Sequence, residues 1–228
     1  MKEYSIKEIQ EILDKETHKE GKFMEIEVFE LYMLLEMYYQ SALEEVETKL
    51  KIIDRELSTR FTNSKKNSIH QIDHRIKRFK SVVHKLNIKK VDFSSQNIRE
   101  HVRDFAGIRV ICSYTDDIYL ILDSLTQQSD VTLIEVKDYI KHPKPSGYRS
   151  VHAIVEIPVF FLDETKYLKV EIQFRTIAMD FWASLEHGLR YKQNELKDPT
   201  LSKQLEQIAS EISEIEDRML TIRKEIEK

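Results

Sequence analysis

The loop HPKPSGYRSVH, at residues 142–152 of this 228-residue chain, brings three chemically useful side chains close together. Lys144, Tyr148 and His152 follow one another at intervals of four, and two prolines and a glycine bend the backbone around them. An aromatic ring stacked on a nucleobase contributes about 1–3 kcal/mol to binding, and a cation beside it suits a phosphate. An ordinary surface loop with an exposed tyrosine would have the same composition, so this interpretation needs support from other residues.

The segment 166–175 has the two-residue period of a β-strand with one apolar face. Every even position from 168 to 174 is apolar. The opposite face is a row of mostly ionisable groups: Lys169, Glu171, Gln173 and Arg175. Such a row could line a binding site, but a solvent-exposed sheet face would look similar, and the strand by itself leaves both interpretations open.

A carboxylate and a guanidinium mark the start of another apolar segment, FAGIRVICS at 105–113. Asp104 directly precedes this segment, and Arg109 lies within it. A carboxylate at a strand edge is a common ligand of Mg²⁺, which binds one or two carboxylates together with substrate phosphates. In a regular strand the two side chains would point to opposite faces. We therefore expect either that Asp104 lies before the strand or that Gly107 forms a bulge.

Positive charge is concentrated upstream of these groups. Residues 65–90 contain nine bases and one acid, Asp73, for a net charge of +8, although the whole chain has a net charge of −4. Such a segment is either a solvated helix face or a site for a polyanion such as a nucleotide or nucleic acid. The four glycines lie at least 40 residues apart, which excludes a Walker A loop and a GxGxxG fingerprint. Any nucleotide must therefore be bound by Lys and Arg side chains rather than by a glycine-rich loop.

The hydrophobic pattern predicts an α/β fold, in which a mixed sheet of about five strands is framed by long terminal helices. Four β-branched segments are expected to be strands: 105–113, 131–140, 151–157 and 166–175. A crossover helix is expected around DDIYLILDSL, between the first two of these segments, and another helix from about 176 to 192. Apolar residues at spacings of three and four also predict helices over 1–60 and 69–86.

The most regular pattern lies near the C-terminus, where Leu, Ile and Met recur at alternating steps of four and three from Leu201 to Ile226. Spacing of this kind over more than three heptads is typical of a coiled-coil seam. The seam either packs between subunits or folds back onto residues 28–53 of its own chain. We favour packing between subunits, because two long amphipathic ends exceed what one small sheet can cover.

Five motifs occur together in a fixed order: RIKRFKS (75–81), DFAGIRV (104–110), HPKPSGYRSVH (142–152), EIQFRT (171–176) and MDFWASLEHGLRYK (179–192). In this combination the chain resembles the synthetase domain of the RelA/SpoT family and, at this length, a stand-alone small alarmone synthetase of the RelP/RelQ type. The resemblance covers about residues 69–193. It implies a nucleotidyltransferase-like fold and transfer of the β,γ-pyrophosphate of ATP to the 3′-hydroxyl of GDP or GTP, giving ppGpp or pppGpp.

The resemblance also implies roles for the matching residues. Asp104 and Glu171 would hold Mg²⁺, and Glu171 or a group beside it would accept the proton of the attacking hydroxyl. Gln173, on the same strand face as Glu171, would orient that hydroxyl. The positions that match ATP-binding residues are two arginines that would sandwich the adenine and three residues for the phosphates: Arg75, Arg109, Lys77, Ser81 and Lys85. The last three are spaced i, i+4, i+8 and are expected to share one helix face.

On the acceptor side, Tyr148 matches the tyrosine that stacks on guanine, and Lys144 and His152 match phosphate-binding positions. Asp180 matches a position that reads the guanine edge, where a carboxylate accepts from both N1–H and the exocyclic amine. Lys137 stands where some relatives carry Arg, so the charge is kept but the planar fork is lost. No His in the chain is followed directly by Asp, and we expect no hydrolase activity of the kind that the long bifunctional relatives have.

The expected organisation is N-terminal helices at 1–62, a synthetase domain at 63–193 and an oligomerisation helix at 194–228. Small alarmone synthetases that resemble this chain are homotetramers, and a homotetramer is expected. No apolar run approaches the ~18 residues of a membrane span, and the N-terminus lacks the apolar core of a signal peptide, so we expect a cytoplasmic protein.

The alternative function is a non-catalytic module that binds RNA or a nucleotide through the same basic segment. A binder of polyanions gains nothing from two carboxylates beside the phosphates, whereas a Mg²⁺ enzyme needs them. RNA binding is therefore not predicted.

Overall fold

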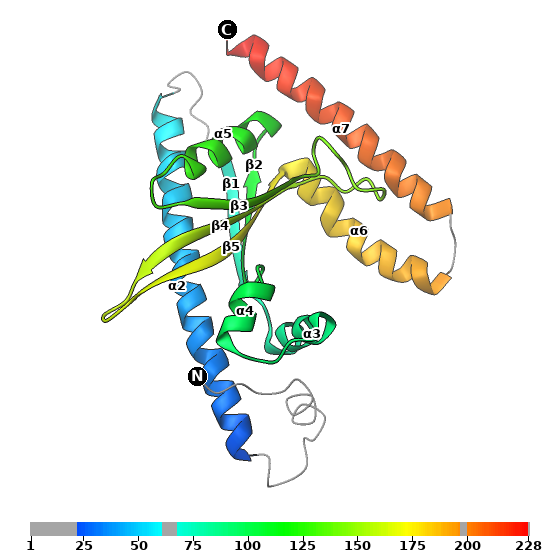
Figure 1. Ribbon diagram of the computed structural model, residues 1–228. Coiled ribbons are helices and arrows are strands. Elements are labelled where there is room, and N and C mark those ends of the chain that lie inside the picture. Colours follow the sequence, from blue (N-terminus) through cyan, green and yellow to red (C-terminus); the bar gives the residue numbers. More distant parts are fainter. Residues whose placement is uncertain (1–21, 61–67, 197–199, 228) are drawn as a thin grey trace.

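A mixed five-stranded sheet forms the centre of the molecule, which confirms the predicted α/β fold. The computed structural model describes residues 22–60, 68–196 and 200–227. The strands are β1 (Ile69–Ile76), β2 (Ala106–Cys112), β3 (Thr132–Asp138), β4 (Val151–Phe160) and β5 (Thr165–Thr176). The helices are α2 (Lys22–Arg60), α3 (Phe79–Lys89), α4 (Ser95–His101), α5 (Thr115–Thr126), α6 (Ile177–Leu196) and α7 (Thr200–Ile226). In the order β1-β2-β5-β4-β3, β2 and β5 are parallel and the other neighbours are antiparallel (Figure 1).

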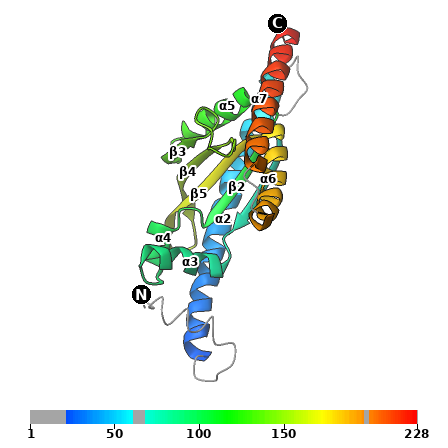
Figure 2. The same ribbon diagram turned by 90° about the vertical axis from the view of Figure 1, so that its right-hand side faces the viewer.

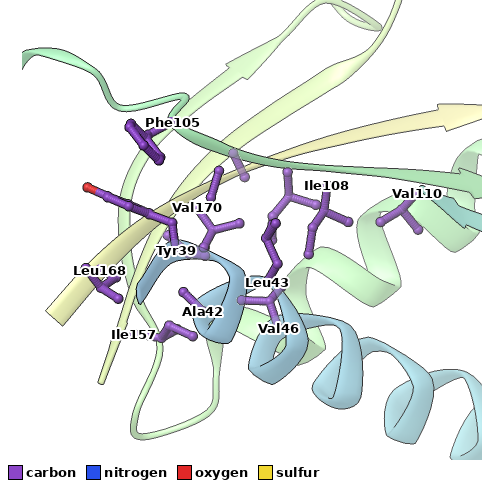
Figure 3. Close-up of a cluster of buried hydrophobic side chains, with 14 of the residues drawn as sticks. Tyr39, Ala42, Leu43, Val46, Phe105, Ile108, Val110, Ile157, Leu168 and Val170 are labelled. Carbon is purple, nitrogen blue, oxygen red and sulfur yellow. The ribbon is translucent and has the colours of Figure 1, made fainter. Parts of the chain in front are cut away.

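The long helix α2 covers one face of the sheet (Figure 1). Buried side chains of α2, among them Tyr39 and Leu43, pack with Ile108 of β2 and Val170 of β5 to form the core (Figure 3). The sequence of α2 contains no glycine or proline that would interrupt a helix. The prediction of a helix over 1–60 is thus confirmed for 22–60, whereas its stripe of isoleucines at positions 6, 9 and 12 lies outside the described residues.

Residues 69–76 form a strand, so the predicted helix over 69–86 is wrong in its first half. This strand, β1, lies at the sheet edge, and its register with β2 shifts between Ile69 and Gln71. The extra residue of such a bulge puts Ile69 and Ile72 on the same face although they are three positions apart, which imitates helical spacing. The second half of the segment is helical, as predicted, from Phe79 onward.

The short helix α4 was not predicted from the sequence. Its N-cap is Ser94, whose hydroxyl accepts a hydrogen bond from the backbone N–H of Asn97 at 3.1 Å. Within the helix only Ile98 is fully buried, so no apolar periodicity reveals it. Together α3 and α4 lie beside one end of the sheet (Figure 1).

The helices α6 and α7 follow β5 and pack on each other (Figure 1). Trp182 of α6 donates from Nε1 to the backbone carbonyl of Leu205 in α7 at 3.1 Å. Near the other end of α7, Arg223 pairs with Asp116 and Asp117 at the start of α5. In the side view α7 extends past one end of the sheet and α2 past the other (Figure 2). Across the described ranges, no helix combines the length and apolarity that crossing a membrane requires.

Candidate functional site

The sheet face that points away from the core carries a row of polar residues across all five strands. The strand register aligns these residues as neighbours: Asp73, Arg109, Gln173, His152 and Lys137. The next row along the strands contains Arg75, Gly107 and Glu171. The alternation predicted for 166–175 is confirmed, since the even positions from 168 to 174 of β5 are buried in the core.

Two arginines from neighbouring strands line one cavity of about 290 Å³. Arg75 of β1 stands opposite Gly107 of β2, and Arg109 lies two residues further along β2. Gln173 also lines this cavity. Arg75 projects from a strand, although the sequence pattern predicted a helix over 69–86. Because guanidinium planes stack on aromatic faces, this cavity is suited to a flat ring.

A second cavity, of about 380 Å³, is lined by the cations that were expected to bind phosphates. Ser81 and Lys85 belong to α3, but Lys77 precedes the helix and does not share its face, contrary to the prediction. Instead, the backbone N–H of Lys77 donates to the carbonyl of Phe105 at 2.8 Å, which fixes Lys77 beside the start of β2. All three residues nevertheless line the same cavity, together with Lys80.

Asp104 lies just before β2, which is one of the two arrangements that the sequence allowed. Its carboxylate accepts from Lys85 Nζ at 2.7 Å and from Lys77 Nζ at 2.9 Å. Burial alone would raise the pKa of Asp104, but the two lysines outweigh it and hold this pKa below its ordinary value. Asp104 is therefore a firmly charged carboxylate beside the basic cavity.

Glu171 is a half-buried carboxylate held by a neighbour on the same strand. Gln173 donates from Nε2 to Glu171 Oε2 at 2.8 Å. The other carboxylate oxygen, Oε1, lies 3.8 Å from Nδ1 of His152 on the adjacent strand β4. The carboxylate thus has a defined orientation on the polar face.

Tyr148 and Asp180 are joined through a buried arginine. The Tyr148 hydroxyl lies 2.9 Å from Nε2 of His152 and accepts a hydrogen bond from Arg175 Nη2, also at 2.9 Å. Arg175 Nη1 donates to Asp180 Oδ1 at 2.9 Å, and Arg109 approaches the same oxygen at 3.6 Å. The aromatic residue and the acidic residue that the motifs singled out therefore belong to one network.

Lys144 extends this cluster towards solvent. Its ammonium group lies 4.8 Å from the ring centroid of Tyr148 and 4.6 Å from that of Tyr139, distances typical of cation–π contacts. Burial, assisted by the charges of Lys144, Arg175 and Lys137, lowers the pKa of His152 to about 4. His152 is therefore neutral at pH 7.

Lys137 is less closely engaged than the other predicted site residues. It stands opposite His152 in the sheet register, but its ammonium group lies 3.2 Å from Glu135 on its own strand. Half of its side chain is exposed. Lys137 therefore acts on this cluster electrostatically, since its charge helps to lower the pKa of His152.

Two residues of the cluster were not among the predicted site residues. The sequence did indicate that Arg175 shares a strand face with Glu171 and Gln173, but nothing in it indicated the contact of Arg175 with Tyr148. Tyr139 packs edge-on against the His152 ring at a centroid distance of 5.3 Å, and no motif or spacing singled it out. Both contacts depend on how β3, β4 and β5 pair.

The described residues contain no group of three or more His, Cys, Asp or Glu side chains that could hold a metal ion on its own. The donor set fits Mg²⁺, because this ion uses one or two carboxylates and takes its other ligands from phosphates and water. Asp104, just before β2, and Glu171, on the neighbouring strand β5, supply two carboxylates. Both carboxylates keep acceptor capacity beyond the hydrogen bonds that they already accept.

Comparison with known proteins gives a consistent result. The profile of the family described as the region found in RelA/SpoT proteins matches residues 74–196. GTP pyrophosphokinase YwaC of Bacillus subtilis is 41% identical over 191 residues, which are 84% of this chain and 90% of that protein. The crystal structure of small alarmone synthetase 2 from Bacillus subtilis has a TM-score of 0.74 at 41% identity and covers 85% of this chain and 98% of that one. Small alarmone synthetase 1 of the same organism, bound to its product pppGpp, has a TM-score of 0.74 at 32% identity and covers 87% of this chain and 100% of that one.

Proposed function

This chain belongs to the RelA/SpoT family, and on that premise we propose that it is a GTP pyrophosphokinase of the small alarmone synthetase type. It transfers the β,γ-diphosphate of ATP to the 3′-hydroxyl of GDP or GTP, and the products are AMP and ppGpp or pppGpp. The observation that carries this assignment is the continuous polar face of the sheet. Along it lie an arginine-lined cavity, the carboxylate of Glu171 and the network around Tyr148.

In this proposal ATP occupies the two basic cavities. Its adenine lies between Arg75 and Arg109, and its phosphates lie against Lys77, Ser81 and Lys85. Both lysines are already held near the start of β2 by Asp104. Because their positions are fixed before the nucleotide arrives, little side-chain entropy is lost when the phosphates bind.

The guanine nucleotide occupies the cluster around Tyr148. The tyrosine ring stacks on guanine, and Asp180 accepts hydrogen bonds from the base. Both contacts of Asp180 with arginines use Oδ1, and a carboxylate retains further acceptor capacity. Lys144 and His152 face the acceptor phosphates, with Lys137 adding positive charge at the edge.

The reaction is an in-line displacement at phosphorus. The 3′-oxygen of the acceptor attacks the β-phosphorus of ATP, the bond to the α–β bridging oxygen breaks, and AMP leaves. Glu171 accepts the proton of the attacking hydroxyl, and Gln173 orients both this carboxylate and the hydroxyl. Phosphoryl-type transfer depends mainly on positioning and charge stabilisation, which the polar face supplies.

Asp104 and Glu171 would hold the Mg²⁺ ion of this reaction. When bound, the ion would neutralise charge on the phosphate oxygens and help to align the two substrates.

We also propose that the protein is a cytoplasmic homotetramer in which residues 194–228 contribute to assembly. Apolar residues that remain exposed on α7 support this proposal. The division into segments 1–62, 63–193 and 194–228 stays a prediction.

A synthesis assay tests the proposed reaction. The full chain is incubated with Mg²⁺, γ-labelled ATP and either GDP or GTP. Labelled ppGpp or pppGpp and unlabelled AMP are expected in equal amounts. The control is 3′-deoxy-GTP, which lacks the attacking hydroxyl and should give no product. If the chain binds guanine nucleotide but forms no product at any Mg²⁺ concentration, it is instead a non-catalytic binding module.

A further inference from the structure

In two pairs of consecutive residues, the first residue contacts the acceptor site and the second contacts the C-terminal helix α7. Tyr148 points into the site, whereas the next residue, Arg149, donates from Nη1 to the hydroxyl of Ser213 on α7. Arg175 holds Tyr148 inside the site, whereas the next residue, Thr176, donates its hydroxyl to Glu216 on α7. In both pairs the second residue connects the site to the same helix.

The loop that carries Tyr148 also presses its backbone against α7. Gly147 has a φ of 86°, and a Cβ added to it would lie 2.6 Å from the Cβ of Ala209 and 3.4 Å from the Cα of Glu206. The first of these distances is shorter than real Cβ atoms show, so the loop or the helix would have to shift. Figure 1 shows this loop, between β3 and β4, reaching out to α7. The residue before the tyrosine is therefore in direct contact with the helix.

One stripe of α7 makes all these contacts. Ala209 and Ser213 are only 6% and 8% exposed, and Glu216 follows them at helical spacing. Burial raises the pKa of Glu216, an effect that Thr176 and Arg149 oppose. The apolar residues of the predicted seam, such as Ile208 and Ile215, lie on a different face and are about half exposed. The helix therefore has an inward stripe of small or polar residues and an outward stripe of large apolar ones.

Thr176 transmits its contact to the site through two elements. Its hydroxyl accepts from the backbone N–H of Met179 at 3.2 Å, so it caps the first turn of α6, where Asp180 lies. Because the same hydroxyl donates to Glu216, α7 supports both the end of β5, which carries Arg175, and the start of α6.

We infer that α7 is a brace of the acceptor site, in which Ser213 and Glu216 are positioning residues for Tyr148, Arg175 and Asp180. This inference rests on the proposed function, since it assumes that the guanine nucleotide binds at Tyr148. Its consequence is a coupling between two surfaces of one helix. A second copy of the chain that docks on the outward stripe of α7 acts on acceptor binding rather than on ATP binding.

The double variant Ser213→Ala with Glu216→Ala removes both side-chain contacts of the brace. We expect the KM for GDP or GTP to rise about tenfold, the effect of 1.4 kcal/mol, while the KM for ATP changes less than twofold. Glu216→Gln keeps an acceptor for Thr176 and should retain most of the acceptor affinity. Glu214→Ala, an exposed position on the same helix, is the matched control and should leave both KM values unchanged.

Calorimetric titration of the intact chain and the double variant with GDP or GTP measures acceptor binding without turnover. It therefore tests this inference separately from the proposed function. If the intact chain makes no alarmone, the proposed function fails, whatever the variants do. If it makes alarmone but the double variant leaves the acceptor KM unchanged, or raises both KM values equally, the brace is refuted. Light scattering and thermal unfolding accompany these measurements, and a rise in the acceptor KM at unchanged mass and with native unfolding supports the brace.

Discussion

Glu171 is oriented without being neutralised. Gln173 donates to one of its oxygens at 2.8 Å, and the neighbouring imidazole of His152 has a pKa lowered to about 4 and therefore carries no charge at pH 7. A charged imidazole at this place would form an ion pair with the carboxylate and weaken it as a base. The surroundings of Glu171 are thus compatible with proton acceptance.

Glu171→Gln keeps the shape of the side chain and removes its charge and basicity. We expect kcat to fall about 10²- to 10⁴-fold, the range for loss of a general base, while the Kd for GDP or GTP stays within a factor of three. Steady-state kinetics and calorimetry measure the two quantities. Glu164→Gln, an exposed carboxylate in the β4–β5 turn, serves as the control. Equal loss of binding and turnover would remove Glu171 from the role of base.

Tyr148 offers a ring for stacking and a hydroxyl for orientation, and two substitutions separate these contributions. Tyr148→Ala removes the ring, so the KM for the acceptor should rise about 5- to 150-fold, which corresponds to 1–3 kcal/mol of stacking. Tyr148→Phe keeps the ring but loses the hydroxyl's contacts with Arg175 and His152, and its effect should be smaller. The KM for ATP, measured in parallel, should change little in either variant; a matching rise would contradict stacking on the acceptor.

At the scale of elements, two glycines give opposite predictions for the same substitution. In Gly147→Ala the added Cβ would clash with α7, and the alanine would need a positive φ that L-residues rarely take. The substitution should therefore lower the free energy of unfolding by at least about 1 kcal/mol and lower Tm by about 2–4 °C or more. Gly188 lies in α6, where an added Cβ meets nothing within 4 Å. Gly188→Ala should therefore stabilise the helix by about 0.5–1 kcal/mol. Calorimetric unfolding of both variants checks the two signs, and a stable Gly147→Ala variant would show that the loop does not press on α7.

The elements that the sequence predicted well are those whose signal is local. The strands β2, β4 and β5 each bury a face or are apolar throughout, and this shows in their residue types before any partner is known. Strand β3 buries no face, and its β-branched residues alone predicted it. Strand β1 was mistaken for a helix because its bulge, which depends on pairing with β2, sets the spacing of its isoleucines. The short helix α4 was missed because its capping serine is a weak signal beside a single buried isoleucine.

The candidate site, too, was predictable only where the signal is local in the sequence. The motif residues from 75 to 180 could be named from the sequence, and strand pairing brings the central ones together on one face. The bond between Arg175 and Tyr148 joins residues 27 positions apart, and no spacing rule predicts it. The inward stripe of α7 was also hidden, since Ala209, Ser213 and Glu216 are small or polar and the regular apolar pattern beside them dominates the sequence.

At the scale of the whole molecule, the outward stripe of α7 is an exposed apolar surface that the proposed reaction does not explain. Its residues Ile208, Ile215, Met219, Ile222 and Ile226 are all at least 45% exposed. The contacts of α7 with α6 and α5 leave this stripe uncovered by the other residues that the structure describes, and residues 28–53 of α2 lie across the sheet from it (Figure 1). Burying such side chains contributes about 1.5–3 kcal/mol each, which favours a second copy of the chain as the cover.

Light scattering at micromolar concentration should give a mass of four times 27.2 kDa, the mass of one chain. Ile215→Glu combined with Ile222→Glu should reduce this mass, because an interface would bury two unpaired charges, which is strongly unfavourable. The same substitutions cost little in a separate chain, where both positions are about half exposed. Leu162→Glu, a fully exposed apolar residue in the β4–β5 turn, is the matched control and should leave the mass unchanged. A mass near that of one chain for the unmodified protein would refute the tetramer while leaving the assignment of the polar sheet face intact.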